Sequence, residues 1–301
     1  MQEKTKPTLA DSLKSADTEE WIDIHFYRPM GFRWALFFDK IGVSPNQITI
    51  ASIFIGIGAG ICFYFTDFWI NLLGVFLLIW ANTYDSADGQ LARMTGKKSE
   101  MGRILDGACG DIWFITIYLA IVFRLWDQWD YWILILALAA GYSHSLQASM
   151  ADYFRNLHLF FLKGKSGSEF HNSKDLAEKL KQISWKNPAV KIFEIFYLNY
   201  TRQQERFSPR TQKMMEVIKT RKNGNVSERF RDEFRMKSLR YINMTNLLSF
   251  NLRAIVLFIS VLIGFPWIYF AFELTVMNIM LIYMVNRYER ICRKFTGGLT
   301  A

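Results

Sequence analysis

The sequence predicts an all-α, polytopic membrane protein with six transmembrane helices. Of its 301 residues, 51% are hydrophobic and 16% are aromatic. These residues gather in uncharged runs, such as ITIASIFIGIGAGICFYF at Ile48–Phe65. A hydrocarbon core of ~30 Å requires about 20 mainly apolar residues of helix, so runs of this kind are typical of membrane spans.

Six stretches reach the required length, although two of them do so only by extending through polar positions. We expect spans at about residues 46–66, 68–95, 102–126, 131–160, 243–263 and 266–290. The alternative is a soluble protein with buried core helices. We disfavour it, because core helices rarely run so far without a charged residue.

The charged residues orient the chain. The net charge is +9, yet the loops near Asp67, Asp127–Asp130 and Gly264 contain no Lys or Arg. By the positive-inside rule, both termini and the stretch Tyr84–Asp111 face the cytoplasm. We expect a bacterial inner membrane, or the endoplasmic reticulum if the source is eukaryotic. Lys and Arg beside anionic headgroups account for the basic charge without a nucleic-acid partner.

The chain divides into four segments by composition. The first ends in the amphipathic stretch Met30–Ile41, which we expect to form an interfacial helix, followed by a turn at Gly42–Asn46 in which Ser44 can cap the next helix. The insertion between the fourth and fifth spans is basic, and we expect it to be helical and cytoplasmic. The segments are 1–45 (N-terminal segment), 46–162 (first four spans), 163–241 (insertion) and 242–301 (last two spans and tail).

Three aspartates lie beside the second and third predicted spans. Asp85 and Asp88 are three residues apart, on one face of a helix, and Asp106 follows on the next helix. Carboxylates at the edge of a membrane are costly, so they indicate function. Carboxylates from two adjacent helices can hold hard divalent cations, and a pair of such ions can clamp a diphosphate.

The spacing of these residues resembles the signature of the CDP-alcohol phosphotransferase family. The matching residues are Asp85-x-x-Asp88-Gly89-x-x-Ala92-Arg93, then eight residues, then Gly102-x-x-x-Asp106, with Ser44-Pro45-Asn46-x-x-Thr49 ahead of the first span. The resemblance covers about residues 42–160 and does not extend to the insertion.

The resemblance implies a fold of six helices, a homodimer, and a polar cavity open to the cytoplasm. It implies Mg²⁺ or Mn²⁺, two ions per site, held by Asp85, Asp88, Asp106 and Asp111. It places the cytidine nucleotide at Asp85, Gly89, Ala92, Arg93 and Gly102. The implied reaction transfers a phospho-alcohol group from a CDP-linked donor to a hydroxyl group and releases CMP.

The sequence departs from the family pattern at the fourth aspartate. The residue four positions after Asp106 is Gly110, and Asp111 comes one position late, about 140° from Asp106 on a regular helix. A π-bulge in Gly107–Gly110 would bring Asp111 into the cavity. Otherwise another group or water takes the proton, or the protein binds nucleotide without transfer. We expect the bulge, with Asp111 and Asp106 as the catalytic residues.

The donor and acceptor are less clearly indicated. Arg155 ends the fourth span and Arg253 lies within the fifth, where an arginine is expensive unless it faces a wet cavity or an anion. We expect both to bind an acceptor phosphate, together with Lys97 and Ser99; the alternative is that Arg253 pairs with Glu273. These residues favour CDP-diacylglycerol as donor and a polar alcohol as acceptor, and among such alcohols we expect an inositol phosphate. The alternatives are a CDP-choline or CDP-ethanolamine enzyme with a lipid acceptor, and a nucleotide-binding scaffold or transporter.

Overall fold

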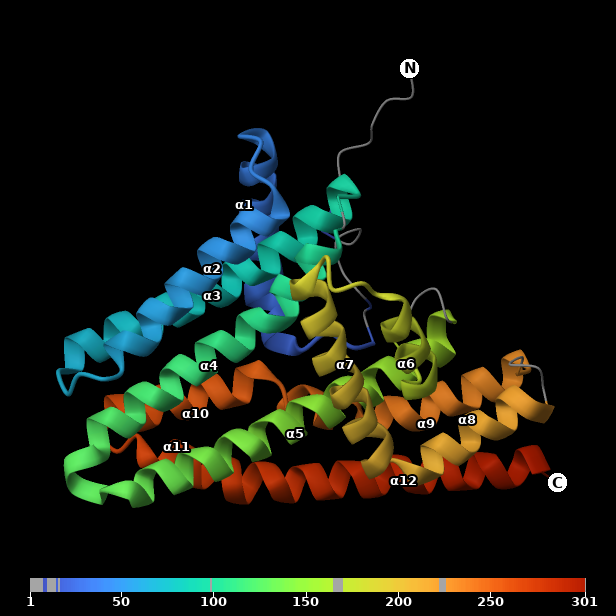
Figure 1. Cartoon of the computed structure of the whole chain (residues 1–301). Coiled ribbons are helices and arrows are strands. Elements are labelled where there is room, and N and C mark those ends of the chain that lie inside the picture. The colour runs from blue at the N-terminus through green and yellow to red at the C-terminus, as the bar shows by residue number, and fades with distance from the viewer. Residues whose placement is uncertain are drawn as a thin grey trace. The chain divides into compact units, whose positions relative to one another are not determined.

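The computed structural model describes residues 8, 9, 15, 17–97, 99–164, 170–221 and 226–300. Within these ranges the structure is helical and contains no strand, which confirms the all-α prediction (Figure 1). Part of the predicted N-terminal segment, at residues 1–7, 10–14 and 16, lies outside the described residues. The helices, of which η2 and η4 are π-helical, are η2 (Asp23–Tyr27), α1 (Arg28–Lys40), α2 (Pro45–Cys62), α3 (Phe68–Thr95), α4 (Glu100–Trp129), α5 (Tyr131–Lys163), α6 (Ser173–Gln182), α7 (Pro188–Phe207), α8 (Pro209–Arg221), α9 (Glu228–Leu247), α10 (Phe250–Leu262), α11 (Trp267–Phe272), η4 (Glu273–Met277) and α12 (Asn278–Thr300).

Among the described residues, five helical stretches are long and apolar enough to cross a membrane. They are Pro45–Cys62, Met101–Trp129, Tyr131–Lys163, Glu228–Leu262 and Trp267–Leu299. They overlap five of the six predicted spans, which supports the polytopic prediction. The second predicted span forms α3, a helix of 28 residues. Because polar side chains such as Asn71 and Asn82 interrupt its apolar part, its crossing stays a prediction.

Large apolar side chains on these helices point outward. Phe54 is 68% exposed, Ile115 is 60% exposed and Leu138 is 66% exposed. A soluble protein rarely exposes so much apolar surface, whereas lipid is a suitable neighbour for it. This surface argues against the soluble alternative.

The chain forms two compact units, each built from separated stretches of sequence. One unit comprises Met1–Gly141 and Ala254–Ala271, and the other comprises Tyr142–Arg253 and Phe272–Ala301. In the first unit, α2 packs on α3 and α4, and α1 packs on α3. The aspartates of the sequence motif belong to this first unit.

Helix α2 begins where the sequence predicts. Gly42 has φ of 78°, a conformation that suits glycine, and Pro45 is the first residue of the helix. The Gln47 side chain accepts a hydrogen bond of 2.8 Å from the Ser44 backbone N–H, which ties down the first turn. The predicted amphipathic stretch Met30–Ile41 lies within and just after α1, where Trp34 packs on Tyr84 of α3 with ring centroids 5.3 Å apart.

A close approach between α2 and α4 depends on Gly56. A Cβ atom at Gly56 would lie 2.1 Å from Cδ1 of Trp113, whose indole nitrogen donates to the Ser52 carbonyl at 3.1 Å. Two residues later, on the other side of α2, a Cβ at Gly58 would meet only Leu77 Cδ1, at 3.8 Å. The same substitution at these two glycines therefore separates a steric effect from a helix-propensity effect.

Gly56→Ala is expected to destabilise the protein by about 1–3 kcal/mol, because the new methyl group overpacks the Trp113 contact. Gly58→Ala is the matched control. It is expected to be neutral or to stabilise by up to about 1 kcal/mol, because Ala favours a helix interior over Gly. Thermal unfolding of the two variants in detergent measures the difference. Equal midpoints would contradict this packing.

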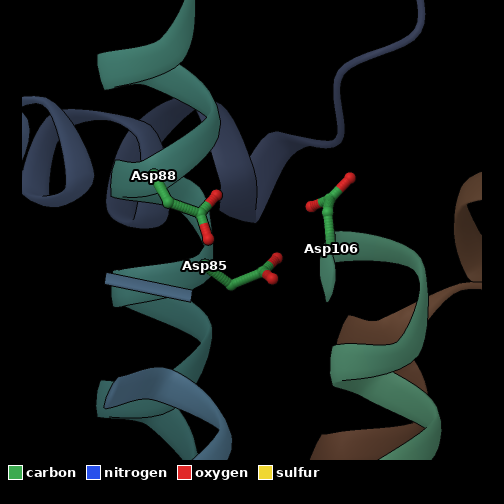
Figure 2. Close-up of side chains that lie close together, drawn as sticks. All are labelled: Asp85, Asp88 and Asp106. Carbon is green, nitrogen blue, oxygen red and sulfur yellow. The ribbon is translucent and has the colours of Figure 1, made fainter. Parts of the chain in front are cut away.

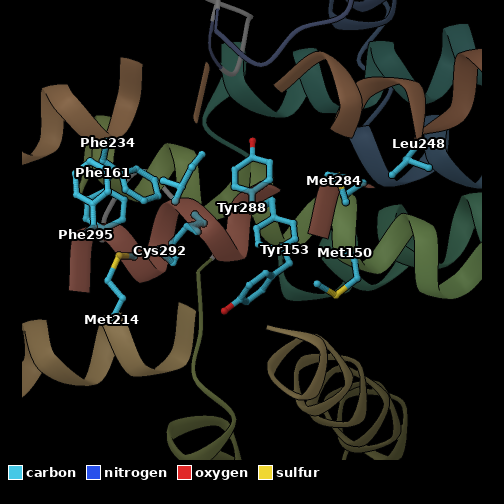
Figure 3. Close-up of a cluster of buried hydrophobic side chains, with 14 of the residues drawn as sticks. Met150, Tyr153, Phe161, Met214, Phe234, Leu248, Met284, Tyr288, Cys292 and Phe295 are labelled. Atoms are coloured by element: carbon cyan, nitrogen blue, oxygen red, sulfur yellow. The ribbon is translucent and has the colours of Figure 1, made fainter. Parts of the chain in front are cut away.

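The predicted insertion is part of the core of the second unit and is not a free linker. Buried Met214 of α8 and Phe234 of α9 pack in one cluster with Phe161 of α5 and Phe295 of α12 (Figure 3). The ring centroids of Phe161 and Phe234 are 4.2 Å apart. His158 of α5, fully buried, lies 2.7 Å from the Ser238 hydroxyl of α9. The described part of the insertion is mostly helical, as predicted, in α6, α7, α8 and α9.

Candidate active site

Three carboxylates meet between α3 and α4. Ligand oxygens of Asp85, Asp88 and Asp106 all lie within 4.8 Å of one another. Figure 2 shows Asp85 and Asp88 projecting from α3 toward Asp106 of α4. Asp88 is 3% exposed, Asp85 is partly buried and Asp106 is exposed. Three of the four aspartates that the resemblance implied as metal ligands are therefore together, with one edge open to a ligand.

The buried member of this cluster is held by a neighbouring helix. The Thr49 hydroxyl of α2 donates a hydrogen bond to the Asp88 carboxylate, and Thr49 itself is 3% exposed. Burying a carboxylate is costly unless opposite charge and hydrogen bonds compensate it. Asp88 lies beside the carboxylates of Asp85 and Asp106, and the three negative charges repel one another. A cation bound between the three carboxylates would remove this repulsion.

Two arginines, one on α3 and one on α1, lie beside the part of α3 that carries the aspartates. A Cβ at Gly89 would lie 3.3 Å from Nη1 of Arg93, so the Arg93 side chain folds back over Gly89. The Arg93 charge interacts with those of Asp88 and Asp106. Arg28 of α1 donates to Ser86 Oγ at 3.3 Å and pairs with Glu19 at 2.9 Å. Sequence reasoning missed Arg28 and gave Thr49 no role, because their nearness to the cluster depends on the packing of α1 and α2.

Gly102 and Ser99 join α4 to the start of α2. A Cβ at Gly102 would lie 2.7 Å from Asn46 Oδ1, and the Asn46 and Ser99 side chains are 3.3 Å apart. The Ser99 hydroxyl also accepts the Gly102 N–H at 2.9 Å and caps α4. Gly102 thus makes room for Asn46 in this structure. The Lys97 side chain is exposed, and Ala92 is half-buried on α3. The acceptor role predicted for Lys97 and Ser99 stays a prediction.

The π-bulge predicted at Gly107–Gly110 is wrong. Helix α4 is α-helical from Glu100 to Trp129, and the described π-helical turns lie at η2 and η4. Regular α-helix turns about 100° per residue, so Asp111 points away from the side that carries Asp106. Asp111 is exposed and is not a member of the carboxylate cluster.

Arg155 belongs to the second unit and is half-buried. Its Nη2 donates to Asn246 Oδ1 at 3.3 Å, and Asn246 is 4% exposed. Its Nε is buried and has no hydrogen-bond partner among the described residues. A guanidinium with an unused buried donor is suited to bind an anion.

Arg253 pairs with Glu273, the alternative that the sequence left open. Its Nη1 lies 2.8 Å from both carboxylate oxygens of Glu273. Its Nε and Nη2 donate to the carbonyls of Ser249 and Leu248, and the side chain is 1% exposed. His144 Nδ1 is 3.7 Å from the same carboxylate. The prediction that Arg253 binds an acceptor phosphate is therefore not supported, because its donors are already engaged.

Comparison with known protein families finds a similarity in the first half of the chain. The family model for CDP-alcohol phosphatidyltransferase matches residues 42–153. Residues 42–153 are therefore similar to the CDP-alcohol phosphatidyltransferase family. This phosphatidyltransferase domain contains α2, α3, α4 and most of α5, and it contains all three clustered aspartates. The family uses a divalent metal ion, and the cluster offers the hard oxygen ligands that such an ion prefers.

Two curated proteins are similar to parts of the chain. One is the archaetidylinositol phosphate synthase of Pyrococcus horikoshii, 32% identical over 113 residues, which are 38% of this chain and 57% of that protein. The other is an uncharacterized protein of Aquifex aeolicus, 42% identical over 71 residues, which are 23% of this chain and 34% of that protein. The chain thus spans about half the length of the Pyrococcus horikoshii protein and about a third of the length of the Aquifex aeolicus protein. Arg155 and the insertion lie beyond the family match.

Proposed function

We propose that the protein transfers a phosphatidyl group from CDP-diacylglycerol to a polar alcohol and releases CMP. The meeting of Asp85, Asp88 and Asp106 in the phosphatidyltransferase domain carries this proposal. An inositol phosphate or a similar anionic polyol is the proposed acceptor. It is supported by the printed name of the Pyrococcus horikoshii relative and by the unused buried donor of Arg155.

In the proposed reaction, the acceptor hydroxyl oxygen attacks the phosphorus next to diacylglycerol. The bond from that phosphorus to the bridging diphosphate oxygen breaks, and CMP leaves with the oxygen. Asp85, Asp88 and Asp106 would hold Mg²⁺ or Mn²⁺, two ions per site, which neutralise the diphosphate when bound. Arg93 binds the nucleotide phosphates, with Gly89, Ala92 and Gly102 alongside.

The proton of the acceptor hydroxyl needs a base. Asp111 does not reach the cluster in the regular helix α4. Asp106 belongs to the cluster and is its exposed member, so an acceptor arriving from solvent meets it first. We therefore assign the proton to Asp106, in place of the expected Asp111. The proposal includes a homodimer in a cell membrane, with the site facing the cytoplasm.

A panel of acceptors tests the proposal. The purified protein is given CDP-diacylglycerol and Mg²⁺ or Mn²⁺ with inositol, inositol phosphate, glycerol phosphate, serine or ethanolamine, and CMP and the lipid product are measured. Inositol phosphate is expected to give the fastest turnover. CMP release with CDP-choline or CDP-ethanolamine and a lipid acceptor would favour the other enzyme class. No release with any pair would favour a nucleotide-binding scaffold or transporter.

Arg155→Gln is expected to raise KM for inositol phosphate by about 10-fold or more, because it removes a charged hydrogen bond to the phosphate. It should leave the rate with an uncharged acceptor such as inositol nearly unchanged. Lys213→Gln, which removes an exposed positive charge from α8, is the matched control. An equal loss with both acceptors would show that Arg155 acts on folding and not on the phosphate.

A further inference from the structure

One face of α7, in the insertion, exposes large apolar side chains. Ile192 is 46% exposed and Phe196, one turn later on the same side, is 69% exposed. Trp185, just before the helix, is 63% exposed, and the Lys191 ammonium lies 5.0 Å from the centre of its ring. Arg202 and Arg206 are exposed farther along α7. We call this set (Trp185, Ile192, Phe196, Lys191, Arg202 and Arg206) the α7 face.

The acidic residues of α7 are turned away from this face. Glu194 is 2% exposed and accepts a bond of 2.8 Å from the Lys179 ammonium of α6. Glu205 accepts a bond of 2.8 Å from the Ser173 N–H at the start of α6. α7 therefore presents apolar and cationic side chains outward, a combination that is typical of helices lying on anionic bilayers.

The anchor of α7 lies at the level of a membrane surface. Gln204 Nε2 donates to the carbonyl of Ser149 in α5 at 2.9 Å, and both residues are buried. Ser149 lies 18 residues after Tyr131, where α5 begins; 18 residues of helix span about 27 Å, close to the ~30 Å core. Trp129, Tyr131 and Trp132 gather at the junction of α4 and α5, and Trp and Tyr are enriched at membrane interfaces. We therefore infer one interface at this junction and the other near Ser149.

The direction of α7 is also that of a helix lying on a membrane surface. In Figure 1, α7 crosses the direction of α5 and α12 and does not run along it. A helix that crosses the spans lies nearer to the membrane plane than to its normal. A second copy of the same face is a poor partner, because cations would oppose cations.

We propose that the α7 face rests on the surface of the bilayer that holds the spans, and that its preferred ligand is anionic phospholipid. Trp185, Ile192 and Phe196 enter the boundary between headgroups and acyl chains. Arg202 and Arg206 contact lipid phosphates. The insertion is thereby held against the membrane, and this holds whether or not the chain catalyses phosphatidyl transfer.

Quenching of Trp185 by lipid tests this docking. The full chain is placed in nanodiscs of phosphatidylcholine with or without phosphatidylglycerol, each carrying a shallow spin-labelled lipid. The difference between wild type and Trp185→Phe isolates the signal of this indole. We expect Trp185 to be quenched, more strongly with phosphatidylglycerol. Arg202→Gln/Arg206→Gln is expected to shift the docking equilibrium on the order of 30-fold toward the free state.

Lys213→Gln/Lys219→Gln removes the same charge from exposed positions of α8 and should leave the quenching unchanged. An unquenched Trp185 in both bilayers would overturn the proposal, as would quenching that is insensitive to both phosphatidylglycerol and the arginine pair. Cross-linking between copies through Phe196→Cys, measured against the parent protein with its native cysteines, would assign the face to a second copy instead and would also overturn it.

Discussion

Asp88→Asn is expected to lower CMP release by on the order of 10³-fold, with little change in thermal stability. The substitution keeps the shape of the side chain and the hydrogen bond from Thr49 but removes a charge that a metal ion needs. Isothermal titration with Mn²⁺ should show the same loss of binding, which separates a metal ligand from a residue that only supports the fold.

Thr49 supplies the control for this prediction. Thr49→Ser keeps the hydroxyl that donates to Asp88 and should retain most activity. Thr49→Val removes the hydroxyl and is expected to cost about 10–100-fold in activity or metal affinity, as is usual for a group that orients a ligand. Wild-type turnover by Asp88→Asn would contradict the metal site and the proposed function with it.

Asp106→Asn and Asp111→Asn are expected to differ by at least about 10²-fold in activity. Asp106 belongs to the carboxylate cluster, and loss of a general base alone costs about 10²–10⁴-fold. Asp111 is exposed on a regular stretch of α4, so Asp111→Asn should stay within about twofold of wild type.

The pH dependence of the rate distinguishes the two roles of Asp106. If Asp106 takes the proton, the rate of wild type and of Asp111→Asn should rise with pH on the acidic limb of the profile, and the residual activity of Asp106→Asn should lack this rise. If Asp111→Asn instead falls as far as Asp106→Asn, α4 must rewind when substrate binds, and the assignment of the base returns to Asp111.

Features set by local sequence were predicted well. The start of α2 follows from Gly42, Ser44 and Pro45, each of which has a specific backbone preference at a helix start. The meeting of Asp85 and Asp88 follows from their spacing of three residues in a helix. Their approach to Asp106 was inferred from the order of the helices and the family signature, and the structure has the three together.

Features that depend on a choice between partners were not predictable. The sequence placed Arg253 and Glu273 in neighbouring spans but did not decide between an ion pair and an acceptor phosphate. The bulge at Gly107–Gly110 was inferred from a chemical need for Asp111, whereas backbone hydrogen bonding favours an uninterrupted α-helix there. The burial of Met214 and Phe234 in the core required the packing of the insertion on α5 and α12.

The ion pair of Arg253 and Glu273 has a consequence for how the last two helices are made. Each charge alone is expensive in lipid, but the two residues are only 20 positions apart, on either side of the turn at Gly264. A nascent chain that has delivered α10 alone carries an uncompensated arginine. We therefore expect α10 to enter the bilayer together with α11 and η4, as a hairpin with no net charge. Correct insertion of α10 then depends on the synthesis of η4, which carries Glu273.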